Sequence, residues 1–520
     1  MSDVAELTEL NFKEEDEVPR PAFVDEGRPF SAHLILSVMV LACGALAKAS
    51  DEASDAGSLF TFPAMCALVI LYALLQLALL RRFQPSHWVI NPAVQSALFV
   101  HLVPTVSVLI LAVLPYELQE SVGFGAATDQ WAVQYEWLNL IGAVALWTGY
   151  WSGLANGLAK LLVHSRFLER VLRPGVALNN AGVIGLVIIA CSVRLLAVSL
   201  GVYGYSSSYD TLIAAGGYSE YIFIASALGR VALVAVSLVY FQSGAGAWLV
   251  IGLLVVETAF GVLSGFKSAV VLPVIIVGMS YYAQRGKIPR WLLPVAISGI
   301  FVAYALIEPF RTARNEETSF DGTSLFSIID TFSASRDPTY MKVEPDGALT
   351  TTVVTFLARG NDVGSAVPGI EYAARTEVLP QGSPQFLEDI LFSPFYSIVP
   401  RILWDGKPMN DLGLWYTRVV MGTGTMSSTA MYPVTYLNFA GGAVAVFLGF
   451  LAVGVIQSML FRGLLAHGGS AVFVVVCMFG FLGHIDSLYY SFFISVFRNI
   501  PMLLAIQWVV FLPGPRRHAA

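Results

Sequence analysis

Two arginines lie inside long hydrophobic stretches of this 520-residue chain, where a charge is costly. Arg194 stands about seven residues before the end of the stretch 177–201, and Arg230 stands near the middle of 219–240. At about 1.5 Å per helical residue, they would lie roughly 10 and 16 Å deep in a membrane. A cation at such depth needs a wet cavity, an anionic ligand or a partner, and Glu257 lies at a depth similar to that of Arg194. Two interpretations stay open, an anion-binding site and a structural ion pair, and they can coexist.

Further cations lie at the ends of hydrophobic stretches. Lys267 falls in a tight turn between two stretches, and Arg311 and Arg314 follow the stretch that ends at Pro309. Arg311 and Arg314 are three residues apart, so they share a face if the helix continues beyond the proline. A guanidinium group matches phosphate oxygens with two parallel hydrogen bonds, so these cations, with Arg401 further along, predict a site for a lipid-linked diphosphate. The alternative is that they only contact lipid headgroups.

The elements that must position these residues are membrane helices. Of the residues, 56% are hydrophobic and 12% are charged, and the mean hydropathy is +0.69, whereas soluble domains carry roughly 25% charge. A span needs about 20 apolar residues, and it must be helical because lipid offers no hydrogen-bond partners. We therefore predict an all-α, polytopic integral membrane protein with about 12 transmembrane helices. The predicted spans are 31–49, 59–80, 89–114, 137–158, 177–201, 219–240, 246–264, 268–283, 291–309, 433–460, 470–484 and 497–513.

The distribution of Lys and Arg between the short loops predicts the orientation. One set of loops carries most of them, and the alternating set carries only Lys48 and Lys267. Because positively charged loops stay in the cytoplasm, we expect both termini there, in a bacterial inner membrane. The predicted organisation is a disordered cytoplasmic tail, helices 1–9, a large periplasmic loop with an amphipathic or re-entrant segment, helices 10–12, and a second cytoplasmic tail. The corresponding ranges are 1–29, 30–310, 311–432, 433–513 and 514–520.

Motifs of several function classes are missing from the sequence. It contains no G-x-x-x-x-G-K-[ST], H-E-x-x-H, C-x-x-C or Asp-x-Asp pattern. We therefore expect neither ATP-driven transport nor metalloprotease chemistry, and no metal, other cofactor or nucleic-acid partner. The four cysteines fall inside predicted spans, so we expect no disulfides. They are Cys43, Cys66, Cys191 and Cys477.

Three segments resemble a known family. GFKSAVVLPVIIVGMSYYAQRGKIP (Gly265–Pro289), which leads to EPFRTAR, resembles the central region of O-antigen polymerases, the Wzy-type oligosaccharide repeat-unit polymerases. IVPRILWDGKP (Ile398–Pro408) and MSSTAMYPVTYLNFAGGAVAVFLGF (Met426–Phe450) look like the end of their periplasmic loop and the next span. The resemblance covers about residues 260–460. It implies a GT-C-like membrane fold.

The resemblance also implies a function. A metal-independent membrane glycosyltransferase would polymerise undecaprenyl-diphosphate-linked repeat units of O-antigen, capsule or exopolysaccharide on the periplasmic side of the membrane. Its partners would be a lipid-linked oligosaccharide donor and acceptor, membrane lipids, a chain-length regulator and a flippase. Two alternatives stay open, an O-antigen ligase-like glycosyltransferase and a twelve-span transporter of a polysaccharide precursor or another anionic solute. The sequence specifies neither the sugars nor the oligomeric state.

In such a reaction the diphosphate leaving group gains negative charge, which an arginine cluster would stabilise. Arg311, Arg314 and Arg401 match positions in the family-like region, and Arg194 and Arg230, with Lys267, join them through their charge and depth.

The acceptor hydroxyl also needs a proton acceptor. The first candidates are His484 and Asp486, and Asp362 is the second, although a His-x-Asp pair at a helix end can also be a cap. Three aromatic residues are candidates for stacking on sugar rings, although an aromatic belt at the membrane interface explains them equally well. They are Trp404, Trp415 and Tyr489.

Overall fold

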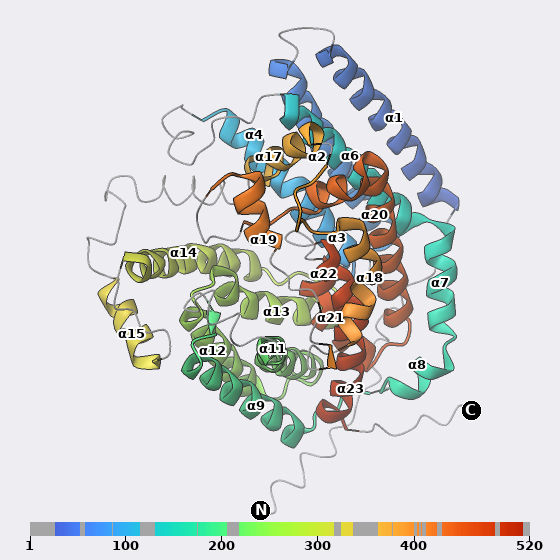
Figure 1. The fold of residues 1–520 in the computed structure, drawn as a ribbon. Coiled ribbons are helices and arrows are strands. Elements are labelled where there is room, and N and C mark those ends of the chain that lie inside the picture. The colour runs from blue at the N-terminus through green and yellow to red at the C-terminus, as the bar shows by residue number, and fades with distance from the viewer. Residues whose placement is uncertain are drawn as a thin grey trace, which may run out of the picture.

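The computed structural model describes most of the chain. The described residues are 27–52, 58–85, 87–114, 130–173, 175–204, 218–316, 324–335, 362–376, 378–399, 403–404, 407, 412–423, 429–483 and 489–512. Within these ranges the regular elements are helices, and a single bridge pairs Leu178 with Phe511. The prediction of an all-α fold is confirmed for this part of the chain (Figure 1).

Residues 27–334 supply two groups of helices. The N-terminal group, blue to cyan in Figure 1, comprises α1 (Gly27–Glu52), α2 (Ser58–Phe83), η2 (Trp88–Ile90), α3 (Pro92–Ser96), η3 (Ala97–Leu102), α4 (Val103–Ala112), α6 (Gln130–Trp151), α7 (Gly153–Val163) and α8 (Arg166–Val171). The second group, green to yellow, comprises α9 (Asn180–Ser199), α11 (Tyr218–Ser243), α12 (Ala247–Leu263), α13 (Lys267–Arg285), α14 (Leu292–Glu316) and α15 (Leu325–Ala334).

Residues 362–510 supply the remaining helices. Short helices come from the predicted periplasmic loop: α17 (Asp362–Arg375), α18 (Phe386–Ile398), α19 (Leu412–Trp415) and η8 (Tyr416–Val420). They are followed by α20 (Pro433–Leu465), α21 (Ser470–Gly483), α22 (Tyr489–Ile494), η9 (Ser495–Asn499) and α23 (Ile500–Val510). In Figure 1 these last helices, drawn in red, lie between the N-terminal group and the green group.

Eight helices among the described residues are long and apolar enough to cross a membrane. Two further predicted spans correspond to shorter apolar helices, in α12 and α21. The remaining two correspond to α6 and α13, which are 22 and 19 residues long but less apolar. The protein is therefore a polytopic membrane protein, and the full number of 12 spans stays a prediction. The eight are Pro29–Ser50, Thr61–Phe83, Pro92–Ala112, Asn180–Ser199, Tyr221–Ser243, Leu292–Arg311, Pro433–Leu465 and Tyr489–Val510.

Helix α20 contains a sharp break that its apolar composition does not reveal. Gly442 has φ 64° and ψ −153°, a conformation that residues with a side chain rarely adopt. Together with Gly441 it divides α20 into a short segment, 433–440, and a long one, 443–465. The short segment packs against the loop helix α18, where the rings of Tyr436 and Phe439 contact Phe386, and the long segment packs against α6, where Gly454 approaches Leu146.

The long part of α20 and α6 approach each other closely at two glycines. A Cβ atom added to Gly454 would lie 1.9 Å from the carbonyl oxygen of Leu146, and one added to Gly149 would lie 2.1 Å from that of Leu451. Small residues let membrane helices pack backbone to backbone, which strengthens dispersion contacts. This contact joins α20 to the N-terminal group.

We expect Gly454→Ala to destabilise the protein by about 1–3 kcal/mol, because the methyl group forces two backbones apart. Thermal unfolding in detergent measures the effect. Gly157→Ala on α7 is the matched control, since its added Cβ would meet no atom within 4 Å. In a helix interior that change should stabilise by about 0.5–1 kcal/mol. Equal unfolding temperatures for both variants would contradict the close packing.

The helices of the predicted periplasmic loop are attached to the membrane helices through aromatic rings. The ring of Phe386 on α18 lies 5.6 Å from that of Trp415, 5.2 Å from Tyr436 and 5.0 Å from Phe439 on α20. The opposite face of α18 exposes Leu387, Leu391 and Ile398 and other apolar side chains, as an amphipathic interfacial helix would. Helix α18 lies within residues 311–432, where the sequence predicts an amphipathic or re-entrant segment.

Candidate functional site

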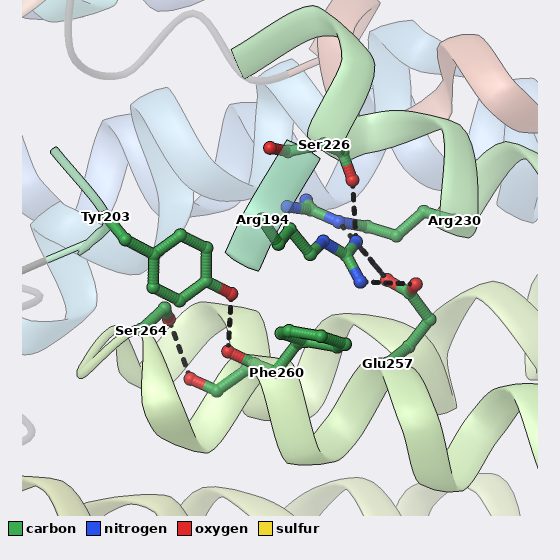
Figure 2. Close-up of polar contacts among 8 residues, drawn as sticks. Arg194, Tyr203, Ser226, Arg230, Glu257, Phe260 and Ser264 are labelled. Atoms are coloured by element: carbon green, nitrogen blue, oxygen red, sulfur yellow. Dashed lines mark hydrogen bonds and ion pairs between the residues drawn. The ribbon is translucent and has the colours of Figure 1, made fainter. Parts of the chain in front are cut away.

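Arg194 and Glu257 form a buried ion pair within the green group of helices. The Nη1 and Nη2 atoms of Arg194 donate to Oε1 and Oε2 of Glu257, each at 2.7 Å, and Nη2 also donates to the carbonyl oxygen of Ser226 at 2.6 Å. Both side chains are 4% exposed. The pair joins α9 to α12, and the bond to Ser226 adds α11 (Figure 2). The pairing that the sequence left open is therefore present.

A glycine on α11 makes room for this pair. A Cβ atom added to Gly229 would lie 2.1 Å from Oε1 of Glu257 and 3.3 Å from Nη2 of Arg194. The carboxylate can therefore approach the backbone of α11 only because residue 229 has no side chain. The following residue, Arg230, brings a second guanidinium group to the same carboxylate.

Arg230 makes a looser contact with Glu257. Its Nε atom lies 3.9 Å from Oε2, and its side chain is 39% exposed, against 4% for Glu257. Figure 2 shows the side chains from α9, α11 and α12 converging at this point. Two guanidinium groups share one carboxylate, so this group of three carries a net positive charge. Because Arg194 already occupies both carboxylate oxygens, Arg230 is the cation better placed to bind a ligand.

A cavity of about 100 Å³ lies beside these three residues. A cavity needs about 10–15 Å³ of such space to hold one water molecule, so this one has room for a small anionic group. Tyr203 lines it and donates from its hydroxyl to the carbonyl oxygen of Phe260 at 2.8 Å, while the Phe260 ring lies 4.9 Å from the guanidinium carbon of Arg194. The turn after α12 contributes Ser264 and Phe266 to the lining. The site is thus cationic with apolar walls.

Two more of the predicted cations lie at this turn. Arg311, on α14, donates from Nε to the carbonyl oxygen of Gly265 at 3.0 Å, and its guanidinium carbon lies 5.9 Å from the ring centre of Phe266. Lys267 begins α13, and its Nζ atom lies 3.7 Å from the ring centre of Tyr304. The fold therefore brings four of the six predicted cations to the cavity or to the turn that borders it.

Five predicted site residues stay predictions. Arg314 lies in α14 and Asp362 begins α17, but the structure does not describe their side chains. The other three, Arg401, His484 and Asp486, lie outside the described residues.

The three aromatic candidates differ in exposure. Trp404 is 37% exposed, and its ring centre lies 5.6 Å from that of Tyr396. Trp415 donates from Nε1 to Ser383 at 3.2 Å and packs in the aromatic contact described above. Tyr489 is 1% exposed and donates to the carbonyl oxygen of Gly449 at 2.7 Å, which is a core packing position. We therefore retain Trp404 alone as a candidate for stacking on a sugar.

The structure adds a candidate proton acceptor that the sequence argument missed. Asp389 on α18 is partly buried, and this burial, followed by the negative charge of Glu388, raises its pKa. A raised pKa brings a carboxylate closer to the range in which it can accept a proton from a hydroxyl near neutral pH. The sequence signal was present, because two adjacent acids open an otherwise apolar segment.

A second missed group lies in α6. The predicted span begins at residue 137, whereas the helix begins at Gln130, so the prediction leaves Glu136 outside the span. In the structure Glu136 is fully buried and contacts Thr105 and Asn139. Its environment differs from that of Glu257 because those two partners are neutral.

Comparisons with family models, curated proteins and solved structures found no match to this chain.

Proposed function

We propose that this protein is a membrane glycosyltransferase that polymerises oligosaccharide repeat units linked to undecaprenyl diphosphate. The observation that carries the proposal is the cationic cavity, where Arg194 and Arg230 share the single carboxylate of Glu257. The adjoining turn with Lys267 and Arg311 extends the positive region. Guanidinium groups in a desolvated site bind phosphoryl oxygens strongly, which suits a diphosphate leaving group. The family resemblance of residues 260–460 supports the same reaction.

The reaction needs groups that stabilise the leaving diphosphate and a group that accepts the hydroxyl proton. The acceptor hydroxyl oxygen attacks the anomeric carbon of the donor, the bond from that carbon to the diphosphate oxygen breaks, and the lipid diphosphate leaves with the electron pair. We assign the growing negative charge to Arg230 and the cations of the turn. The hydroxyl proton passes to a carboxylate or imidazole at the loop, for which Asp389, Asp362, His484 and Asp486 are the candidates.

A transporter is the second candidate, and the buried carboxyl group of Glu136 favours it. Buried acids in membrane helices are common in proton-coupled carriers. A ligase, the third, shares the donor chemistry of the polymerase. The glycans of a deletion strain separate polymerase from ligase: single repeat units on the carrier or core indicate a lost polymerase, and long polymer on the carrier indicates a lost ligase.

The proposed reaction requires that the loop helices face the periplasm. A cysteine introduced by Ser333→Cys on α15 should react with an impermeant thiol reagent in cells whose outer membrane is permeabilised. Glu169→Cys on α8, also exposed, should not react, because α8 is predicted to be cytoplasmic. Both changes are made after replacing Cys43, the native cysteine with an exposed side chain. Labelling of Glu169→Cys alone would show that the orientation in the membrane is the reverse of the predicted one.

Purified protein with lipid-linked repeat units tests the function directly. We expect polymer to form in the presence of EDTA and without an ion gradient, because the arginines replace a metal and the diphosphate bond supplies the free energy. Polymer length on a gel measures the activity. Activity that EDTA abolishes and magnesium restores would rule out transfer by arginines alone, and gradient-dependent uptake of a solute into vesicles would favour the carrier.

A further inference from the structure

A buried carboxyl group lies in the N-terminal helices, apart from the cationic cavity. Asn139 donates from Nδ2 to Oε2 of Glu136 at 3.1 Å, and Thr105 donates from Oγ1 to the same oxygen at 3.2 Å. All three residues are fully buried. Within the described part of the chain, no Arg or Lys forms a hydrogen bond or ion pair with Glu136. A charge on this carboxylate therefore has no direct counter-ion there, unlike the charge of Glu257, which Arg194 balances.

Asn139 connects this carboxyl group to a histidine. Its Nδ2 atom donates to Glu136 and, at 3.2 Å, to Thr105, so its Oδ1 atom is the acceptor of the third contact. Nδ1 of His101 lies 2.6 Å from that oxygen and must therefore carry a hydrogen. Nε2 of His101 is also buried, and among the described residues it has no hydrogen-bond partner. It is the ring nitrogen that can gain or lose a proton.

The histidine ring is held in place by local packing. His101 lies in η3, a π-helical segment whose wider turn shifts side chains from their regular positions. The ring of Phe450 on α20 lies 5.1 Å from the imidazole ring, centre to centre. A Cβ atom added to Gly142 would lie 2.8 Å from Phe450 and 3.4 Å from His101, so only glycine allows this packing. These contacts keep the imidazole in apolar surroundings.

We propose that Glu136, Thr105, Asn139 and His101 form a proton-binding site that holds one proton in the folded protein. With Glu136 ionised and His101 neutral, a full negative charge would be buried without a counter-charge, which is strongly unfavourable. One proton removes that charge. It can sit on the carboxyl group beside a neutral imidazole, or on Nε2, which makes an imidazolium that faces the carboxylate through Asn139. Both arrangements are electrically neutral and contain one bound proton.

Among the side chains that the structure describes, no surrounding titratable group supplies the missing charge. On the elements packed against α6 and η3, these described groups are His33, Cys43 and Lys48 on α1, Cys66, Tyr72, Arg81 and Arg82 on α2, Lys160 on α7, Glu371, Tyr372 and Arg375 on α17, and Tyr436 and Arg462 on α20. Glu371 and Arg375 pair with each other at 2.7 Å, and Arg462 lies over Tyr150, which is 14 residues along α6 from Glu136.

Linkage between folding and proton binding gives the test. In the unfolded chain, Glu and His have pKa values of about 4.3 and 6.5, so above about pH 7.5 the pair holds almost no proton. The folded protein holds one, so folding takes up one proton, and stability falls as pH rises until the site releases it. The unfolding equilibrium constant should therefore rise about tenfold per pH unit from this site.

The test is reversible unfolding of the full chain in mixed micelles, measured at several pH values above about 7.5. Comparison of variants shows how much of the pH dependence comes from this site. Glu136→Gln keeps the shape and is neutral without a proton, so its pH dependence should be weaker by about tenfold per pH unit. Glu371→Gln, in an exposed pair, is the control and should retain the wild-type pH dependence. Equal pH dependence in wild type and Glu136→Gln would overturn the proposal.

If Glu136→Gln fails to fold, a second measurement, made on the wild-type protein, tests the proposal. Infrared spectra of wild-type protein with isotope-labelled glutamate, recorded near pH 7.5, report a protonated carboxyl group, and nitrogen NMR of labelled histidine reports an imidazolium. One of the two signals is expected, and the absence of both would overturn the proposal. Neither experiment uses a glycan substrate, so its outcome is independent of the polymerase assignment.

Discussion

Glu257→Ala is expected to destabilise the protein by about 3–5 kcal/mol, because it leaves the buried guanidinium group of Arg194 without its partner. Equilibrium unfolding in mixed micelles measures this loss. The effect should be large because Arg194 is 4% exposed and directs two hydrogen bonds to the lost carboxylate. Arg230, 3.9 Å from the same carboxylate, would then face Arg194 without any negative charge between them.

Glu371→Ala provides a control in which an Arg–Glu pair with the same contact distance is exposed. Arg375 lies 2.7 Å from Glu371, the same distance as in the buried pair, but these side chains are 67% and 32% exposed. An exposed i,i+4 pair contributes about 0.3–0.5 kcal/mol, so this change should have little effect on the free energy of unfolding. Similar losses for Glu257→Ala and Glu371→Ala would show that the buried pair does not hold α9, α11 and α12 together.

A double variant separates burial of charge from loss of packing. Arg194→Met with Glu257→Leu removes both charges and keeps most of the side-chain volume. Replacement of a buried pair by apolar residues is often neutral or stabilising, so the double variant should recover most of the stability that Glu257→Ala loses. A double variant as unstable as the single one would mean that packing, and not the unpaired guanidinium, sets the cost.

The arrangement around Glu257 was largely predictable from the sequence. A charge deep in an apolar stretch has few ways to exist, so the depths of Arg194 and Glu257 already indicated that they could pair. That Arg230 also contacts Glu257 was harder to predict. Contact between Arg230 and Glu257 depends on Gly229, where the missing side chain lets the carboxylate approach α11, and helix-to-helix distances of this kind are not encoded in hydropathy.

The start of α6 was predicted less accurately, for a physical reason. Hydropathy recognises segments that face lipid, whereas α6 is surrounded by other helices and buries polar residues such as Glu136 and Asn139. Those residues lowered its apolar content and moved its predicted start to residue 137, inside the helix. The break in α20 is easier to predict from the sequence, because adjacent glycines such as Gly441 and Gly442 are a recognised signal for an interrupted helix.

The assignment of the cavity to a diphosphate depends most directly on Arg230. Arg230→Ala should lower the rate of transfer about ten- to hundredfold, because a charge-assisted hydrogen bond contributes about 1.5–3 kcal/mol. Lysine should restore part of the activity, since it keeps the charge but loses the planar fork. Stability should change little, because the side chain is 39% exposed and only loosely paired with Glu257. Loss of activity on replacement of Arg311 would be harder to interpret, because its hydrogen bond to the carbonyl oxygen of Gly265 also stabilises the turn.

Two measurements separate binding of the diphosphate from a general loss of function. The first is kcat for transfer with saturating lipid-linked repeat units, which should fall in Arg230→Ala because the negative charge on the leaving group is greatest in the transition state. The second is inhibition by undecaprenyl diphosphate, which should weaken by a similar factor, because this product presents the same phosphoryl oxygens. Arg375→Ala, an exposed change on α17, is the control for both. A folded Arg230→Ala protein that forms full-length polymer at the wild-type rate and keeps its sensitivity to undecaprenyl diphosphate would exclude the cavity as the diphosphate site.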